Sequence, residues 1–513
     1  MSFLDLSLEL LEEITYWVPA DHSQLRMVCR NLNFAVAPSF FSSLVLDVHS
    51  SRLELGLSHL EALAVGNSQW SQFAHTLKIK RLSPAVAAGA DADELQVAES
   101  RLEQSLRPAL DSLKNVRTVL WIFTSCPDEF RWTVETVHGF MSSLALLEDF
   151  RLASDVSGFA RNYDCSFDRI THLRKLTLTS SDALSLGGLC HSASHMVGNN
   201  PHLSALHLAT DRHWNHPPLH GFADLFYSVV QPLRLTELRL FRYGLRLDHG
   251  TILHLRSLRS LWLFSGNPAM WDTLRAERIH LSELHTDMVV EGLPEYISSY
   301  SGLERLTIVN TNDEDVDLAQ SDRLADKFFS ALSHHHQSLV ALSCAGAYEG
   351  RWSVGGNNVT LLEQLHKLQS LQMNVNSVVA GYKPSTQTGG SGRGARPIIK
   401  IENDEDGRNM VHRFLDLVDK LPISDAVIMP SFPKRFMQDT CGNNFVSNRG
   451  IIIGEIDKAV QEFQSRASRT SGATVLAGHN YYRVKGSEDR YCAVESANLS
   501  WPYSYDHSFG KRS

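Results

Sequence analysis

The sequence predicts an α/β fold in which a small helical module precedes a long array of parallel strands and helices. Three observations support this prediction. The first forty residues carry three short amphipathic helical segments, a leucine-rich phrase then recurs in ten places, and helical patterns lie between its copies. Stacked units of this kind form a solenoid, because one unit alone cannot bury its apolar face. We expect the strands on the concave face of an irregular solenoid and the helices outside.

The first helical segment has one apolar stripe. Leu10, Leu11 and Ile14 share that stripe, and three glutamates lie opposite. Pro19 ends the stretch that follows, because proline interrupts a helix. A module of about forty residues is too small to build a self-sufficient core, so one face must pack against something else.

Two further segments complete the module. Asp21 is an expected N-cap of the second helix. Leu25, Val28 and Leu32 supply another apolar stripe, and Pro38 is expected to close the third helix.

Residues 3–46 resemble an F-box, the segment by which substrate receptors attach to the Skp-family adaptor of cullin (SCF) ubiquitin ligases. The resemblance rests on Leu6, Leu8-Glu9-Leu10-Leu11, Ile14, Pro19, Asp21, Leu25-Arg26, Val28-Cys29-Arg30, Leu32 and Phe40-Phe41. It implies an apolar adaptor-binding surface drawn from Leu6, Leu10, Leu11, Ile14, Val18, Leu25, Val28 and Leu32. Some of these residues must also hold the helices together.

The module departs from the F-box pattern at three positions. Ser7 replaces a proline, which matters little because serine starts helices well. His22 and Ser23 replace two leucines, and polar residues near the adaptor-facing surface are expected to weaken binding. The alternative is an ordinary three-helix start to a globular domain.

The repeated phrase has leucine, or a similar apolar residue, at its first, fourth and sixth positions. Clear copies start at Leu173, Leu203, Leu235, Leu258, Leu281, Leu303 and Leu368, and weaker copies start at Val116, Leu147 and Leu339. The starts at 235, 258, 281 and 303 are 23, 23 and 22 residues apart.

This phrase is similar to the strand of a leucine-rich repeat, whose period is about 20–29 residues. Residues two apart on a strand face the same side, so the leucines point into the core. The alternative is a chance leucine-rich pattern in an α/β domain. An F-box followed by leucine-rich repeats resembles a substrate receptor whose repeats select the target.

The chain divides into three predicted parts: an F-box-like module at 1–46, a repeat array at 47–430, and a C-terminal capping region and tail at 431–513. Gly, Ser and Thr residues followed by an acidic run predict a flexible insertion near 383–407. Residues 85–100 are a second candidate insertion. Helical patterns are expected at 102–113, 324–332 and 452–463, and a tail rich in tyrosine and tryptophan is expected to cap the last repeat.

Composition limits the possible functions. The chain has 513 residues, 43% of them hydrophobic and 20% charged, which is typical of a folded protein. Its net charge of −9 argues against general nucleic-acid binding. No apolar run is long enough to cross a bilayer, and the acidic start is not expected to be a signal peptide. Seven scattered cysteines argue against a disulfide framework, so we expect the cytoplasm, the nucleus or both.

No residue pattern predicts catalysis, a cofactor or a metal. The histidines at 213, 216 and 220 lie in a proline-broken stretch, those at 334 to 336 are consecutive, and Cys441 has no marked histidine partner. Outward-facing strand positions are the better candidates for binding an unknown target protein: Arg239, Phe241, Trp262, Phe264 and His285. Alternatively, the aromatic residues pack beneath a loop or the tail.

The sequence therefore favours a non-catalytic substrate receptor of an SCF-type ligase, acting in ubiquitin-dependent protein degradation. The alternative is a leucine-rich-repeat interaction scaffold that acts without the ligase. An enzyme using the C-terminal region has no supporting constellation of residues.

Overall fold

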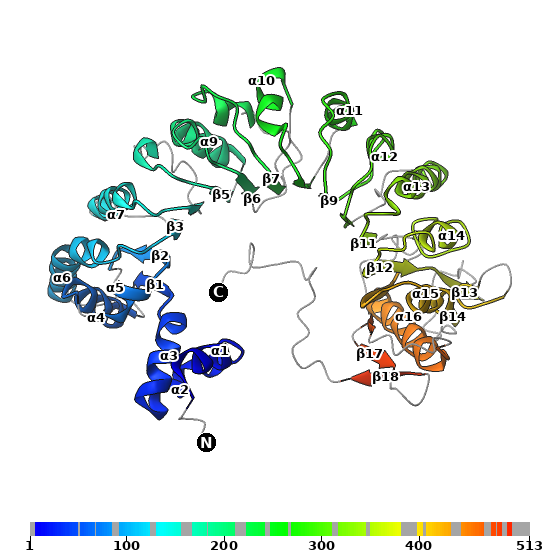
Figure 1. Ribbon diagram of the computed structural model, residues 1–513, viewed down its shortest axis with the longest axis horizontal. Coiled ribbons are helices and arrows are strands. Elements are labelled where there is room, and N and C mark those ends of the chain that lie inside the picture. The colour runs from blue at the N-terminus through cyan, green and yellow to red at the C-terminus, as the bar shows by residue number, and fades with distance from the viewer. Residues whose placement is uncertain are drawn as a thin grey trace, which may run out of the picture. The chain divides into compact units, whose positions relative to one another are not determined.

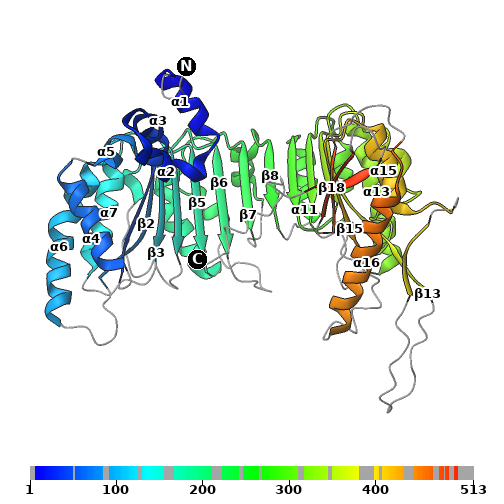
Figure 2. The ribbon, with the colours of Figure 1, turned by 90° about the horizontal axis from the view of Figure 1, so that it is seen from below.

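The computed structural model describes residues 6–49, 52–66, 68–84, 92–123, 130–154, 167–181, 183–210, 222–241, 247–264, 268–309, 317–344, 349–380, 398–403, 407–431, 443–465, 473–478, 480–484 and 490–494. The chain forms two compact units, Met1–Ser257 and Leu258–Ser513. Each unit is an α/β structure with a mostly parallel sheet, as predicted (Figure 1). In each unit the helices that connect consecutive strands lie along one face of that sheet, whereas the first three helices of the chain lie beyond its β1 end (Figures 1 and 2).

The first unit begins with helices α1 (Leu8–Tyr16), α2 (His22–Val28) and α3 (Arg30–Phe40), with the short helix η2 (Pro19–Asp21) before α2. Pro38 does not close the third helix as expected, because the helix continues through it to Phe40. Ser7 and Asp21 occupy the N-cap positions of α1 and α2, although neither side chain makes a capping hydrogen bond.

The sheet of the first unit has seven parallel strands in chain order, each paired with the next. They are β1 (Ser43–Val48), β2 (Thr76–Leu82), β3 (Thr118–Phe123), β4 (Asp149–Ser154), β5 (Lys175–Ser180), β6 (Ala205–Thr210) and β7 (Glu237–Phe241). The helical elements of this unit beyond α3 are α4 (Leu53–Ala64), α5 (Gln69–Phe73), α6 (Ala92–Asp111), α7 (Arg131–Ser143), η5 (Phe167–Arg169), α9 (Ala183–Gly198), η6 (Phe222–Phe226), α10 (His249–Ile252) and η7 (Leu253–Leu255).

The second unit also alternates strands with helical elements, and its last strands are antiparallel. Its parallel strands are β8 (Ser260–Leu263), β9 (Glu283–Thr286), β10 (Arg305–Ile308), β11 (Ala341–Cys344), β12 (Ser370–Val375), β15 (Asp425–Pro430) and β16 (Thr474–Ala477). The antiparallel strands are β17 (Asn480–Val484), β18 (Tyr491–Val494), and the separate pair β13 (Ser377–Ala380) and β14 (Ile398–Ile401). Its helical elements are α11 (Pro268–Ala276), α12 (Leu293–Ser298), α13 (Leu318–Leu332), η8 (Ser333–His335), α14 (Val359–Leu362), α15 (Met410–Lys420) and α16 (Asn443–Glu462).

Leucine ladders hold each sheet to its helices. In the first unit Leu176 pairs in register with Leu206, which pairs with Leu238, and all three are fully buried. All ten predicted phrases form parallel strands, so the prediction that each phrase is a strand is confirmed. A backbone hydrogen-bond pattern also repeats between neighbouring strands. The carbonyl of His75, before β2, accepts hydrogen bonds from the N–H groups of Arg117 (2.8 Å) and Thr118 (3.0 Å). Glu304 does the same for two N–H groups in the second unit.

Two predicted insertions contain regular structure. Helix α6 starts at Ala92, so the prediction of a loose segment at 85–100 is wrong for its second half. Strand β14 lies within the predicted insertion at 383–407, where Ile401 is buried. Residues 383–397 and 404–406 of that range lie outside the described residues.

The predicted helical segments near 102–113, 324–332 and 452–463 correspond to α6, α13 and α16. In the C-terminal part, Tyr482 is buried and its hydroxyl donates to Asp457 Oδ1 on α16 (2.9 Å). The remaining tail aromatics, Trp501, Tyr503 and Tyr505, lie outside the described residues. The division at residues 46 and 430 stays a prediction.

Candidate functional site

The N-terminal module has a small core of its own. Leu11, Leu32 and Ala35 are 0%, 2% and 4% exposed, and three partly buried residues pack against them. These three are Leu6, Leu25 and Cys29. Four of the eight residues predicted for adaptor binding therefore point inward or support the core, namely Leu6, Leu11, Leu25 and Leu32.

The other four predicted residues are exposed. Leu10 is 52% exposed, Ile14 39%, Val18 38% and Val28 63%. On α1 the helical repeat separates the roles, because Leu11 and Thr15 face the core while Leu10 and Ile14, one turn apart, face outward.

Large apolar side chains are unusually exposed on this module. Nine of the sixteen exposed ones among the described residues lie between Leu8 and Phe34. Sequence reasoning missed five of them: Leu8, Tyr16, Trp17, Met27 and Phe34. Trp17 follows Ile14 by three residues, and this helical spacing could have predicted that Trp17 lies on the same exposed side. Exposed apolar side chains gathered in this way are typical of interaction surfaces.

His22, one of the departures from the F-box pattern, is buried inside the module. His22 is 5% exposed, and its Nε2–H donates to the carbonyl of Thr15 (2.9 Å). The expectation that His22 places a polar group on the adaptor-facing surface is therefore wrong, because the ring packs between α1 and α2. Ser23, by contrast, is exposed.

A stacked cation and an aromatic contact join the module to helix α5. The guanidinium of Arg26 lies 4.3 Å from the ring centroids of both Phe40 and Phe41. Phe41 in turn contacts Trp70 edge to face, with 5.0 Å between centroids. Cation–π contacts of this kind contribute about 0.5–2 kcal/mol. Helix α3 is thereby fixed against α5.

Two predicted target-binding residues, Arg239 and Phe241, are half-buried on β7 in the first unit. Arg239 Nε donates to Glu237 Oε1, and His207 Nε2 donates to the same oxygen (3.0 Å). The hydrogen bond from His207, with the nearby Arg239, lowers the pKa of Glu237 to about 2, so this carboxylate stays ionised. Burial lowers the pKa of His207, and the positive charges of Lys175 and Arg239 act in the same direction.

The other three predicted target-binding residues meet in the second unit. The rings of Trp262 and His285 stack, with centroids 4.2 Å apart and planes at 7°. Phe264 lies against His285 at 5.4 Å. Trp262 and Phe264 are half-buried and His285 is 7% exposed, so the exposed part of this cluster belongs mainly to the two aromatic residues.

Among the three consecutive histidines at 334 to 336, His335 has a structural role. His335 is fully buried, its Nδ1 accepts from the N–H of Leu303 (3.1 Å), and its Nε2–H donates to the carbonyl of Ile297 (3.0 Å). Asn200 and His254 serve the N–H groups of Leu173 and Leu233 in the same way. Within the described residues, no group of three or more His, Cys, Asp or Glu side chains has an arrangement suited to a metal. The histidines at 213 to 220 and Cys441 lie outside those residues.

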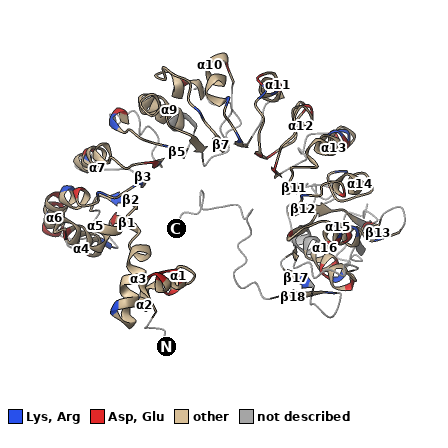
Figure 3. Ribbon diagram, in the orientation of Figure 1, with Lys and Arg blue, Asp and Glu red and all other residues tan. Residues whose placement is uncertain are grey.

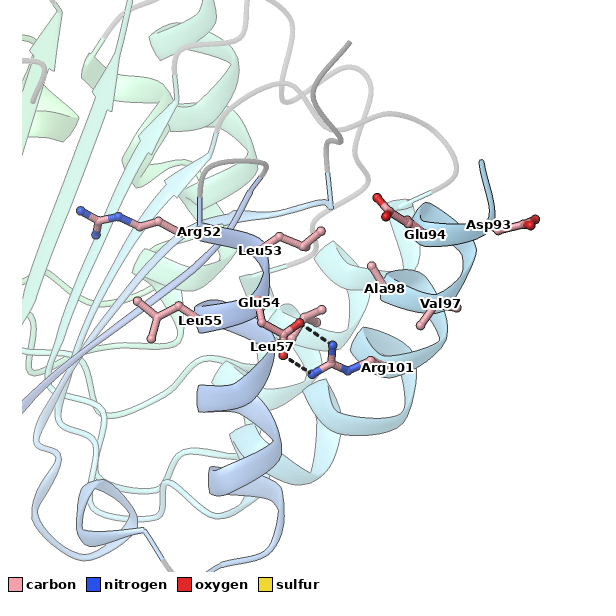
Figure 4. Close-up of a pocket in the computed structure, with 10 residues that line it drawn as sticks. All are labelled: Arg52, Leu53, Glu54, Leu55, Leu57, Asp93, Glu94, Val97, Ala98 and Arg101. Carbon is pink, nitrogen blue, oxygen red and sulfur yellow. Dashed lines mark hydrogen bonds and ion pairs between the residues drawn. The ribbon is translucent and has the colours of Figure 1, made fainter. Parts of the chain in front are cut away.

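A hollow of about 670 Å³ lies between α4 and α6 (Figure 4). Its lining is mixed, with apolar residues such as Leu55 and Val97 and with charged ones. Arg101 closes one end through ion pairs of 2.7 Å to Glu54 and Glu61. The lining carries two arginines and three carboxylates, and it indicates no particular ligand.

No family model matches this chain, and no curated protein sequence matches it. Within the described ranges, no helix combines the length and apolar character needed to cross a membrane.

Proposed function

We propose that this chain is a non-catalytic substrate-recognition subunit of a cullin-type (SCF) E3 ubiquitin ligase. The module at 1–46 binds a Skp-family adaptor, and the strand array at 47–430, with the character of leucine-rich repeats, binds a target protein. The observation that carries the proposal is the set of exposed apolar side chains between Leu8 and Phe34, above all Leu10, Ile14, Val18 and Val28.

Burial of these side chains supplies the driving force for adaptor binding. Complete burial of one leucine or isoleucine contributes about 1.5–3 kcal/mol relative to full exposure. Because Leu10 and Ile14 are already partly covered, each gains roughly half of that. A few such residues suffice for stable docking, and the internal core of Leu11 and Leu32 keeps them in place.

The target would be held on the uncovered faces of the two sheets. Candidate contacts are Arg239 and Phe241 in the first unit, and Trp262, Phe264 and His285 in the second. Ubiquitin transfer would then be accelerated by positioning the target near the loaded enzyme, without a catalytic residue in this chain. This role places the protein in the cytoplasm, the nucleus or both.

The second candidate is an interaction scaffold with leucine-rich repeats that acts without the ligase. The exposed Ser23, where the F-box pattern has leucine, favours it. Adaptor binding distinguishes the two functions.

The test is co-purification of the Skp-family adaptor with the full chain and with the double variant Leu10→Asp, Ile14→Asp. Binding should be lost, because two unpaired charges would be buried at an apolar contact. The matched control is Leu55→Asp with Val97→Asp, which adds the same charges at positions 54% and 59% exposed on α4 and α6. Undiminished adaptor binding by a folded Leu10, Ile14 variant would reject the proposal, and absence of binding by the unmodified chain would favour the scaffold.

A further inference from the structure

Aliphatic side chains lie on the face of the first unit's sheet that carries no helices. On β3, Val119 and Trp121 are buried towards the helices, so the residue between them, Leu120, points to the other face, where it is half-buried. Val45 on β1 points to the same face and is 44% exposed. Exposed aliphatic side chains on such a face are typical of a surface that another molecule covers.

Cations alternate with these apolar residues across the strands. The row that crosses β1 to β4 in register consists of Val45, Lys78, Leu120 and Arg151. Neighbouring strands lie about 4.8 Å apart, so each aliphatic side chain of this row has a cation as its neighbour. Arg151 pairs with Asp149 but keeps 42% of its side chain exposed, so its charge remains accessible to a partner.

A β-bulge adds two more cations to this face. The register between β1 and β2 shifts at Asp47, which therefore lies opposite both Lys80 and Arg81 on β2. Lys80 Nζ and Arg81 Nε each lie 3.9 Å from a carboxylate oxygen of Asp47, and these two side chains are 28% and 48% exposed. One carboxylate thus faces two cations and balances the charge of one. Figure 3 colours the basic residues of β2 blue.

The charge of this face is positive although the protein is acidic. Among the described residues of β1 to β4 that point to it, the cations are Lys78, Lys80, Arg81 and Arg151, and the carboxylates are Asp47 and Asp149, whereas the whole chain carries −9. Cations interleaved with aliphatic groups complement a ligand that carries both carboxylates and bulky apolar side chains. A nucleic-acid backbone would satisfy the cations alone and would place charged phosphates against the aliphatic groups.

We propose that this face of β1 to β4 binds an acidic segment of a partner protein, whose carboxylates pair with Lys78, Lys80 and Arg151. Bulky apolar side chains of the same segment cover Val45 and Leu120. Aspartate and glutamate suffice for this pairing, so the segment needs no modification. The surface lies on other strands than the candidate target-binding residues of β7. Only the identification of the partner as a ubiquitination target rests on the proposed function.

The test measures fluorescence polarisation of the full chain with three labelled peptide pools of equal length. The first pool combines glutamate with leucine, the second glutamate with serine, and the third lysine with leucine. We expect the glutamate–leucine pool to bind at least about tenfold tighter than the other two, because it alone supplies both kinds of contact. A rise in salt from about 0.05 M to 0.5 M should weaken this binding severalfold, because salt screens exposed charges.

Charge reversal tests the cations. Lys78→Glu should lower the affinity for the glutamate–leucine pool by about tenfold and raise the affinity for the lysine–leucine pool, because the variant attracts the opposite charge. The matched control is Arg131→Glu, which makes the same change of charge on α7 at a side chain that is 51% exposed. This control should alter neither affinity.

A polar substitution tests the apolar contact. Leu120→Thr keeps a side chain that favours strands and should cost the glutamate–leucine pool about fivefold in affinity. Thermal melting of the same sample checks that the variant is folded. Val45→Thr, which keeps the shape of the side chain at the more exposed position, is the second variant and should also weaken binding.

The proposal would be overturned by equal binding of the three pools, or by unchanged affinity in Lys78→Glu or in both threonine variants. Binding of the glutamate–serine pool as tight as that of the glutamate–leucine pool, or equal competition by a single-stranded oligonucleotide, would indicate a general anion site and would overturn it as well. Lys78→Glu should still co-purify with the adaptor, and the Leu10, Ile14 variant should still bind the glutamate–leucine pool. This inference and the ligase proposal therefore fail separately.

Discussion

His22 Nε2 lies 2.9 Å from the carbonyl oxygen of Thr15, which ties the start of α2 to the last turn of α1. A residue that breaks the expected leucine pattern thus belongs to the interior of the module. Ser23, the next residue, is exposed and belongs to its surface. The two neighbouring departures therefore have different consequences for adaptor binding.

Ser23→Leu should strengthen adaptor binding, because it adds an apolar side chain where the F-box pattern has one. A gain of about 1–2 kcal/mol, roughly 5- to 30-fold in affinity, corresponds to burial of part of a leucine. Calorimetric titration of the adaptor into the full chain measures it. His22→Leu is the matched control and should change affinity little. No gain for Ser23→Leu would show that this position lies outside the contact.

Leu11→Ala and Leu10→Ala should differ sharply, although the residues are adjacent. Leu11 is fully buried, so its truncation should cost the module about 2–5 kcal/mol. Leu10 is 52% exposed, so its truncation should cost less than about 1 kcal/mol. Hydrogen exchange of the α1 to α3 amides in the full chain reports the local stability. Equal loss of protection in both variants would contradict the assignment of inner and outer faces.

His335 should make the second unit less stable in mild acid. Burial lowers the pKa of His335 below its unfolded value of about 6.5, so the unfolded chain binds more protons. Its contribution is complete above about pH 6.5 and is lost as the pH falls from there towards the lower pKa of the folded state. Exchange of the Leu303 amide, compared at pH 7.5 and 5.5 after correction for intrinsic rates, measures the change.

Substitution provides the control for this pH effect. His335→Ala leaves the Leu303 N–H unsatisfied and should cost about 1–3 kcal/mol. It should also reduce the pH dependence. His336→Ala, at the exposed neighbour on the other side, should do neither. An unchanged pH profile in His335→Ala would assign the effect to another group.

Replacement of residues 381–397 by a short Gly-Ser turn should leave the melting temperature within about 2 °C. The segment connects β13 and β14, which pair from Ser377–Ile401 to Ala380–Ile398, so a tight turn can close the same hairpin. Replacement of 385–406 also removes β14 and the buried Ile401, and should lower the melting temperature by more than about 5 °C. Equal effects of the two replacements would show that the hairpin contributes nothing to stability.

Trp262→Ala with Phe264→Ala should weaken target capture while adaptor binding remains. Tryptophan at a contact surface is often a binding hot spot. Both rings also contact His285, so the denaturant midpoint must be measured on the same variant. Unfolding at markedly lower denaturant would assign the rings to stability, and retained capture at unchanged stability would exclude them from the binding surface.

The strand array was predictable because its physics is local. Leu176 and Leu178 are two residues apart, so strand alternation places both on one buried face of β5, and the fourth and sixth positions of every copy are buried in the same way. Strands β1 and β2 were missed because Ser43–Val48 and Thr76–Leu82 alternate without the leading leucine. Strands β14 and β18 were missed because their partners are set by tertiary pairing.

The module was harder to predict in detail. Leu10 and Leu11 are chemically identical, and helical periodicity allows either to face the core. Packing against Leu32 and Ala35 decides between them, and those contacts come from another helix.

Only two residues separate α3 from β1. This junction is held by the contacts among Arg26, Phe40, Phe41 and Trp70, so it does not act as a hinge. A partner docked on α1 and a target held at Arg239 and Phe241 on β7 would therefore be kept at a constant separation. Their mutual effective concentration would then be set by this junction rather than by linker statistics. A flexible spacer inserted after Ser42 would make the distance between the two partners variable, and it would leave the contacts to each partner in place.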